Sequence, residues 1–312
     1  MPLTFIVFAS FYPAGHHAVA YADALAQALG GRLVLLHINR AAVFDPYDLI
    51  AKGYQRQELA RQTDTVAALE QLATGLRSPA TVEVFTDLLP TVAQDLAARH
   101  QPVLFVLGQP DPAFPAPASL AEACAELLRA GGHPLLVLPA QTVQAAGEPV
   151  ALPRRLLLAA DAEPFGLPPA ALALRELLAL PGSELVVAHV SAGVEDDEGC
   201  ALALRAVRAS GLLAADQPAP ALRGYVSADY AAGLLAAVAD TQADLVVVLA
   251  RPRSYLSELF HRSVTVRLLA QCPVPVLVLP TTAEELPADH PDRAATIAQY
   301  ASVVLSGLSP AS

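Results

Sequence analysis

The fold is decided by a short apolar stretch that occurs twice in the chain. Residues 33–38 read LVLLHI, and residues 185–190 read LVVAHV. Two more pairs follow in the same order, PVLFVLG at 102–108 with ADLVVVL at 243–249, and HPLLVLP at 133–139 with VPVLVLP at 274–280. Similar segments in a constant order indicate an internal repeat. We therefore interpret the 312-residue chain as two copies of one unit.

Each copy alternates strand-sized apolar runs with longer helical patterns. In the first half the pattern predicts strands at 4–9, 32–38, 80–86, 103–108 and 134–138, and helices at 15–29, 55–76, 88–100 and 118–131. In the second half it predicts strands at 154–160, 184–190, 221–226, 244–250 and 275–280, and helices at 167–180, 196–210, 228–241 and 262–271. Apolar strands separated by helices are typical of parallel sheets covered on both faces. Right-handed crossovers then predict a doubly wound α/β fold, with ligand sites at the carboxyl ends of the first and fourth strands.

The boundaries between the units fall where glycine and proline interrupt the pattern. Gly147, Pro149 and Pro153 predict a seam between a first domain at 1–141 and a second at 150–282. The remaining segment, 283–312, begins with acidic residues among prolines. Its apolar residues then fall on one helical stripe that includes Tyr300 and Val304. We expect a short helix that docks on the body, with a helix that binds a partner as the alternative.

Composition excludes several classes of protein. An apolar fraction of 54% with only 16% charged residues excludes disorder for most of the chain. No apolar run is long enough to cross a bilayer as a helix, so we expect no membrane association. A net charge of −11 disfavours nucleic acid as a partner. Three widely spaced cysteines and an N-terminus without a basic leader predict buried free thiols and a cytoplasmic protein.

The order of these segments resembles the universal stress protein family. The resemblance rests on a second strand that ends in His-Val and a last strand of the type PVLVLP, and it covers about residues 1–282. Two copies in one chain resemble the tandem members of that family. The resemblance implies a strand order of 3-2-1-4-5 in each half. It also implies a pseudo-dimer through the last strands at 135–138 and 276–279, and leaves open a further homodimer through other faces.

In nucleotide-binding members of the family, a glycine-rich loop follows the fourth strand. Its pattern is G-x2-G-x9-G-[S/T], in which bare backbone N–H groups approach the phosphates. The second half has Leu249, Pro252 and Arg262 in place of the three glycines, and only Ser263 matches. Pro252 also lacks an N–H group that could donate to phosphate. The resemblance therefore implies that this loop has lost its phosphate-binding mode.

The first half departs further from the family pattern. Gly108 matches the first glycine, but Asp111 stands at the second position in a proline-rich stretch. Ser10 replaces the acidic residue that follows the first strand in the family, whereas Asp161 matches it in the second half. We therefore predict that neither half binds ATP in the family's mode. The candidate vestigial nucleotide or anion pocket consists of Asp161, Val190, Arg251, Arg253, Arg262 and Ser263.

A basic cluster near this loop has two interpretations. Arg251, Arg253, His261, Arg262 and Arg267 lie close together in an acidic chain. Arginines beside the start of a helix could hold a phosphate or carboxylate without glycines. The favoured interpretation is a solvated loop paired with surface acids such as Glu258.

Other chemistry finds little support in the sequence. His37 and His189 occupy equivalent strand ends, which indicates a structural role or a place at a pocket rim, and no metal site is predicted. No nucleophile elbow is present, so catalytic residues are not predicted either. We expect a non-enzymatic stress-response or regulatory protein with an unidentified protein partner and no cofactor. The alternatives are an adenine-nucleotide-binding protein that uses the second half with ATP, or an anion-binding module built on the arginines at 251–267.

Overall fold

The computed structural model describes residues 2–9, 13–38, 52–109, 120–140, 150–214, 217–252 and 264–282. The statements below concern these residues. The helix predicted in the segment 283–312 lies outside them, and the domain boundaries at 141 and 150 stay a prediction.

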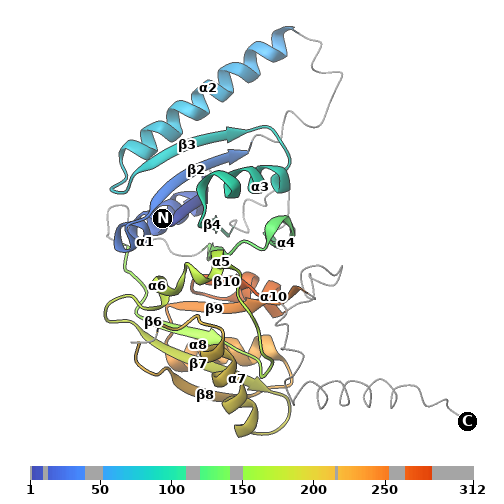
Figure 1. Cartoon of the computed structure of the whole chain (residues 1–312). Helices are drawn as coiled ribbons and strands as arrows, with labels where there is room; N and C mark the ends of the chain where they lie inside the picture. Colours follow the sequence, from blue (N-terminus) through green and yellow to red (C-terminus); the bar gives the residue numbers. More distant parts are fainter. Residues whose placement is uncertain are drawn as a thin grey trace, which may run out of the picture. The chain divides into compact units, whose positions relative to one another are not determined.

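Ten strands form one sheet in the order β3-β2-β1-β4-β5-β10-β9-β6-β7-β8 (Figure 1). The strands are β1 (Thr4–Phe8), β2 (Arg32–Ile38), β3 (Ala80–Phe85), β4 (Val103–Gly108), β5 (Leu135–Leu138), β6 (Arg155–Ala159), β7 (Glu184–Ser191), β8 (Ala221–Val226), β9 (Leu245–Ala250) and β10 (Val276–Pro280). Within each half every neighbouring pair is parallel. The predicted α/β fold and the order 3-2-1-4-5 are confirmed in both halves.

Helices cover both faces of the sheet. They are α1 (Pro13–Leu29), α2 (Lys52–Thr74), α3 (Leu89–His100), α4 (Leu120–Gly131), α5 (Pro169–Leu172), α6 (Arg175–Leu178), α7 (Asp197–Ala209), α8 (Tyr230–Thr241) and α10 (Val264–Gln271). One buried cluster joins side chains of α1, α2, α5, α6 and α7 to one face of the sheet. A second cluster joins α3, α4, α8 and α10 to the other face. Apolar residues run consecutively along the central strands because both of their faces are covered.

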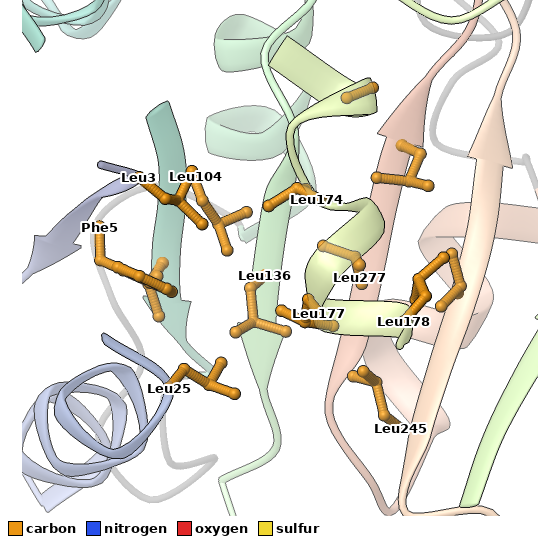
Figure 2. Close-up of a cluster of buried hydrophobic side chains, with 14 of the residues drawn as sticks. Leu3, Phe5, Leu25, Leu104, Leu136, Leu174, Leu177, Leu178, Leu245 and Leu277 are labelled. Atoms are coloured by element: carbon orange, nitrogen blue, oxygen red, sulfur yellow. The ribbon is translucent and has the colours of Figure 1, made fainter. Parts of the chain in front are cut away.

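The two halves meet through their last strands. β5 and β10 pair antiparallel, with Leu136 opposite Leu277, and both side chains are fully buried. Figure 2 shows Leu174 and Leu177 close to these two leucines, with Leu3, Phe5 and Leu104 on the side of the first half. The buried clusters on both faces contain residues of both halves, so the core continues across the joint. The pairing through the last strands that the resemblance implied is therefore observed.

The single helix predicted at 167–180 is wrong. The chain forms two short helices there, α5 and α6, separated at Ala173 and Leu174. The backbone N–H groups of Leu174 and Leu177 donate to the carbonyls three residues earlier, at 3.1 and 3.0 Å. Such bonds belong to the tighter 3₁₀ geometry, which does not extend over long runs. The buried residues Ala171, Leu174 and Leu177 recur at that same spacing of three.

None of the helices in the described ranges combines the length and apolar character needed to cross a membrane.

Candidate functional site

The carboxyl ends of β6 and β9 bring Asp161 and Arg251 together. Asp161 lies two residues after β6, and Arg251 follows β9 directly. The Nε group of Arg251 donates to Oδ2 of Asp161 at 2.8 Å, and one of its terminal nitrogens donates to Oδ1. Both oxygens of the carboxylate therefore accept from one guanidinium, the bidentate arrangement that arginine favours. Two residues of the predicted pocket thus bind each other.

Arg251 also holds the loop that follows β6. Its terminal nitrogens donate to the carbonyl oxygens of Glu163 at 2.8 Å and Pro164 at 3.1 Å. The Glu163 carboxylate lies 3.6 Å from Nε, and the Arg251 side chain is only 14% exposed. Gly166 at the end of this loop exchanges backbone hydrogen bonds with Thr282. The loop after β6 is therefore fixed to the segments that follow β9 and β10.

The two equivalent histidines make the same contact in each half. Nδ1 of His37 lies 3.5 Å from the carbonyl oxygen of Ala9, and Nδ1 of His189 lies 3.1 Å from that of Ala160. Each contact joins the end of the second strand of a half to the residue after its first strand. A carbonyl can only accept, so Nδ1 of His189 carries the proton of this hydrogen bond. For both side chains this contact agrees with the structural role, one of the two roles that the sequence analysis left open.

Val190 lies in the core and not in an open pocket. Its side chain is buried in the cluster under α8. A Cβ atom at Gly233 would come within 2.7 Å of Cγ1 of Val190, so the helix backbone packs directly over it. Val190 therefore belongs to the packing between the end of β7 and α8.

Arg267 binds an aspartate of its own. Asp229 caps the N-terminus of α8, and NH1 of Arg267 donates to its Oδ1 at 2.6 Å. The bond to Arg267, together with the backbone N–H of Ala232, lowers the pKa of Asp229. Both basic residues of the predicted cluster that the structure describes, Arg251 and Arg267, are thus paired with acids. Arg253, Arg262 and Ser263, as well as His261 and Glu258, lie outside the described residues.

A cleft that the sequence analysis missed opens beside β8. It has a volume of about 430 Å³ and lies between the start of α7 and the strand ends, lined by Ser191, Glu195, Asp196, Asp197, Cys200, Leu222, Gly224, Tyr225 and Val226. Asp196 caps α7 through Gly199 and lies 3.5 Å from Nε2 of His189. Four consecutive acids at 195–198 were the available signal, but such a run also suits the start of any helix.

The thiols show no sign of activation. Cys124, Cys200 and Cys272 are free and buried, as predicted. Burial raises the pKa of Cys124 to about 12 and also raises that of Cys272. Burial and the nearby Asp196 and Asp197 raise the pKa of Cys200. Reactive thiols require the opposite shift. Within the described ranges, histidine, cysteine and carboxylate side chains form no group of three or more that could hold a metal ion.

Comparison with known proteins agrees with this architecture. The model of the universal stress protein family matches residues 153–280. A universal stress protein from Archaeoglobus fulgidus DSM 4304 aligns with a TM-score of 0.61 at 16% identity, over 88% of this chain and 97% of that one. A functionally unknown protein from Pseudomonas aeruginosa PAO1 aligns with a TM-score of 0.51 at 16% identity, over 97% of both chains. No curated protein matches the sequence significantly.

Residues 153–280 therefore match the universal stress protein family, and the resemblance recognised in the sequence is confirmed for this part of the chain. The structural likeness to the Archaeoglobus protein extends over both halves and shows a shared fold. A tandem arrangement, with a first half of the same fold, is consistent with these findings.

Proposed function

We propose that the chain is a non-enzymatic stress-response or regulatory protein in which the nucleotide pocket of the second half has lost its ATP-binding mode. The observation that carries the proposal is the pairing of Asp161 with Arg251 at the carboxyl ends of β6 and β9. These strand ends are where a doubly wound sheet binds its ligands. In this chain an internal ion pair occupies them.

The ion pair opposes a ligand at Asp161 for an energetic reason. A nucleotide hydroxyl or amine that donated to this carboxylate would have to displace Arg251. Hydrogen bonds to charged groups contribute about 1.5–3 kcal/mol each. Losing one of them would weaken binding by roughly 10- to 100-fold. Displacement would also release the carbonyls of Glu163 and Pro164, which accept from the same guanidinium.

The backbone after β9 offers few donors to phosphate. Pro252 has no N–H group, and Leu249 places a partly buried side chain where the family motif has bare backbone. The carbonyl of Ala250 accepts from the N–H of Thr281 at 2.9 Å, which ties this strand end to the chain after β10. These features support the loss of a phosphate cradle in the second half.

Calorimetric titration of the full-length protein with ATP and magnesium tests the proposal. We expect no binding tighter than about 10 μM, which corresponds to roughly −7 kcal/mol. A tighter dissociation constant would overturn the proposal and support the alternative, an adenine-nucleotide-binding protein. In that case Asp161→Ala and Ser263→Ala should each abolish the signal.

A restoration variant sharpens this experiment. Leu249→Gly, Pro252→Gly and Arg262→Gly together return the three glycines of the motif, and Arg251→Ala frees the carboxylate of Asp161. We expect this fourfold variant to bind ATP at least about tenfold more tightly than the wild type. Arg208→Ala, which removes an exposed arginine in the last turn of α7, serves as the control for the lost positive charge and should leave the affinity for ATP unchanged. Equal affinities in all three proteins would show that the Arg251–Asp161 pair and the missing glycines do not decide nucleotide binding.

A further inference from the structure

The strand β8 leaves one edge of the sheet open. β8 is the last strand in the sheet order and pairs with β7 alone among the described strands. The N–H group of Ser227 donates to the carbonyl of Ser191, so it points toward β7. Since backbone groups alternate along a strand, those of Leu222, Gly224 and Val226 point away from β7. Unpaired groups of this kind form a template for another strand.

Exposed apolar side chains gather at the same corner of the fold. Val194 is 70% exposed, Val226 is 50% exposed, and Tyr230 at the start of α8 is 48% exposed. These are three of the six large apolar side chains that are exposed in the described part of the chain. Ser191 links the segments that carry Val194 and Val226. Its hydroxyl donates to the carbonyl of Val194, and its carbonyl accepts from the N–H of Ser227, the residue after Val226.

The opposite edge of the sheet, β3, is protected. The helix α2 packs against β3 (Figure 1). Glu83 in the middle of that strand forms ion pairs with Arg99 and His100 at 2.6 and 2.9 Å. Charged side chains and covering helices are the usual means of blocking an edge. In β8 the position that corresponds to Glu83 holds Arg223, which is exposed and lies on the same face as Tyr225, and α7 and α8 pack on the two faces of this strand. The difference between the two edges is therefore the acidic cleft and the exposed apolar side chains beside β8.

Charge selects the kind of segment that would pair with β8. The cleft of about 430 Å³ beside the strand is lined by Glu195, Asp196 and Asp197, and two of these acids are exposed. These acids lie at the start of α7, on the face of the sheet against which Leu222 and α7 pack. Tyr225 packs on the opposite face, under α8. An added strand sends alternate side chains to the two faces, so basic residues would enter the acidic cleft. Apolar ones would lie on the face of Tyr225, where Arg223 disfavours a second basic row.

We propose that the open edge of β8 binds an extended segment of another protein in which basic and apolar residues alternate. A second copy of this chain fits less well, because it would bring the same acidic cleft and a net charge of −11 to the interface. The proposal is independent of nucleotide binding, which concerns the ends of β6 and β9.

Fluorescence anisotropy with a labelled synthetic peptide tests this surface. The probe is a peptide of about eight residues that alternates valine and lysine, the length of a typical strand. We expect it to bind the full-length protein and to lose affinity as salt rises. A peptide that alternates valine and glutamate should not bind. Equal binding of the two peptides, or no binding of the lysine peptide at about 1 mM, would overturn the proposal.

Two kinds of variant locate the binding. Val226→Pro removes an outward N–H group without breaking the bonds to β7, and we expect it to weaken binding by at least about tenfold. The matched control on the other edge is Thr86→Pro, which stands at the position equivalent to Val226 after β3 and should leave binding unchanged. Should Val226→Pro fail to fold, the double variant Glu195→Gln with Asp197→Asn replaces it. This variant is nearly isosteric with the wild type and should weaken binding of the lysine peptide.

Light scattering of the free protein tests whether a second copy of the chain binds at β8 instead. A dimer that Val226→Pro dissociates would show that a second copy binds there and would overturn the proposal.

Discussion

Glu83 is held on β3 by two basic side chains of α3. Its oxygens accept from Arg99 at 2.6 and 3.0 Å and lie 2.9 Å from Nε2 of His100. Burial alone would raise the pKa of Glu83, but the bonds from Arg99 and His100 outweigh it and lower the pKa below its ordinary value of 4.5. A carboxyl group whose pKa is lower in the folded state stabilises that state above its unfolded pKa and loses this effect as the pH falls.

We therefore predict that Glu83→Gln lowers the melting temperature near pH 7, and that the difference from the wild type shrinks as the pH falls below the ordinary pKa of 4.5. Thermal melts followed by circular dichroism at several pH values check this. Asp87→Asn, an exposed acid in the loop after β3, is the control and should shift the melting temperature little at any pH. A difference for Glu83→Gln that stays constant with pH would mean that packing, and not charge, sets its effect.

At the scale of residues, sequence analysis identified candidates but not their partners. It singled out Asp161 from the family pattern and Arg251 from the basic cluster. The two lie 90 residues apart, and no local spacing indicates which acid a given arginine will meet. The contacts of His37 and His189 were easier to anticipate, because the repeat places both residues at equivalent strand ends. The cleft beside β8 was missed because it depends on how α7 leaves the sheet.

The end of helix α10 depends on a residue of the other half. Nε2 of Gln109, just after β4, donates to the carbonyls of Leu269 at 3.3 Å and Ala270 at 3.1 Å. Its Oε1 accepts from the N–H of Ala140. Carbonyls in the last turn of a helix lack partners inside the helix, so a side chain that donates to them stabilises the end. In the first half, the end of α4 is stabilised in the same way. The side chain of Gln94 on α3 donates to the carbonyl of Ala130 at 3.0 Å.

We predict that Gln109→Ala destabilises the protein by about 1 kcal/mol and speeds amide hydrogen exchange in α10. Gln94→Ala is the matched control and should speed exchange in α4 instead. Hydrogen exchange followed by mass spectrometry separates the two helices. If Gln109→Ala leaves exchange in α10 unchanged, the contact across the joint does not hold that helix.

The elements themselves were largely predictable, because the buried strands are continuously apolar. All ten strands lie within one or two residues of their predicted limits. The prediction of one helix at 167–180 was wrong because the spacing of its apolar residues fits two structures equally well. Ala171, Leu174 and Leu177 satisfy a helical pattern, yet their spacing of three also suits two short turns. The helical stripe in 283–312 lies outside the described residues, so that prediction stays open.

For the molecule as a whole, the joint between β5 and β10 is where the sheets of the two halves become one. Leu136 and Leu277 lie opposite each other and are fully buried, under leucines of α6 (Figure 2). We predict that Leu136→Lys with Leu277→Lys separates the halves or causes aggregation, because two charges would be buried without partners. A lower melting temperature and increased light scattering would show this.

The control for that variant adds the same two charges at the surface. Leu88 is 62% exposed and Leu152 is 37% exposed, so Leu88→Lys with Leu152→Lys should keep wild-type melting and scattering. Wild-type behaviour of the buried double variant would place the interface of the halves elsewhere.

The same joint also affects how the protein responds to dilution. Two separate subunits that met through such strands would part as their concentration fell, in proportion to their dissociation constant. Here β5 and β10 belong to one polypeptide, so each strand sees its partner at a fixed local concentration. The ten-stranded sheet therefore persists in a cell that holds only a few copies of the chain.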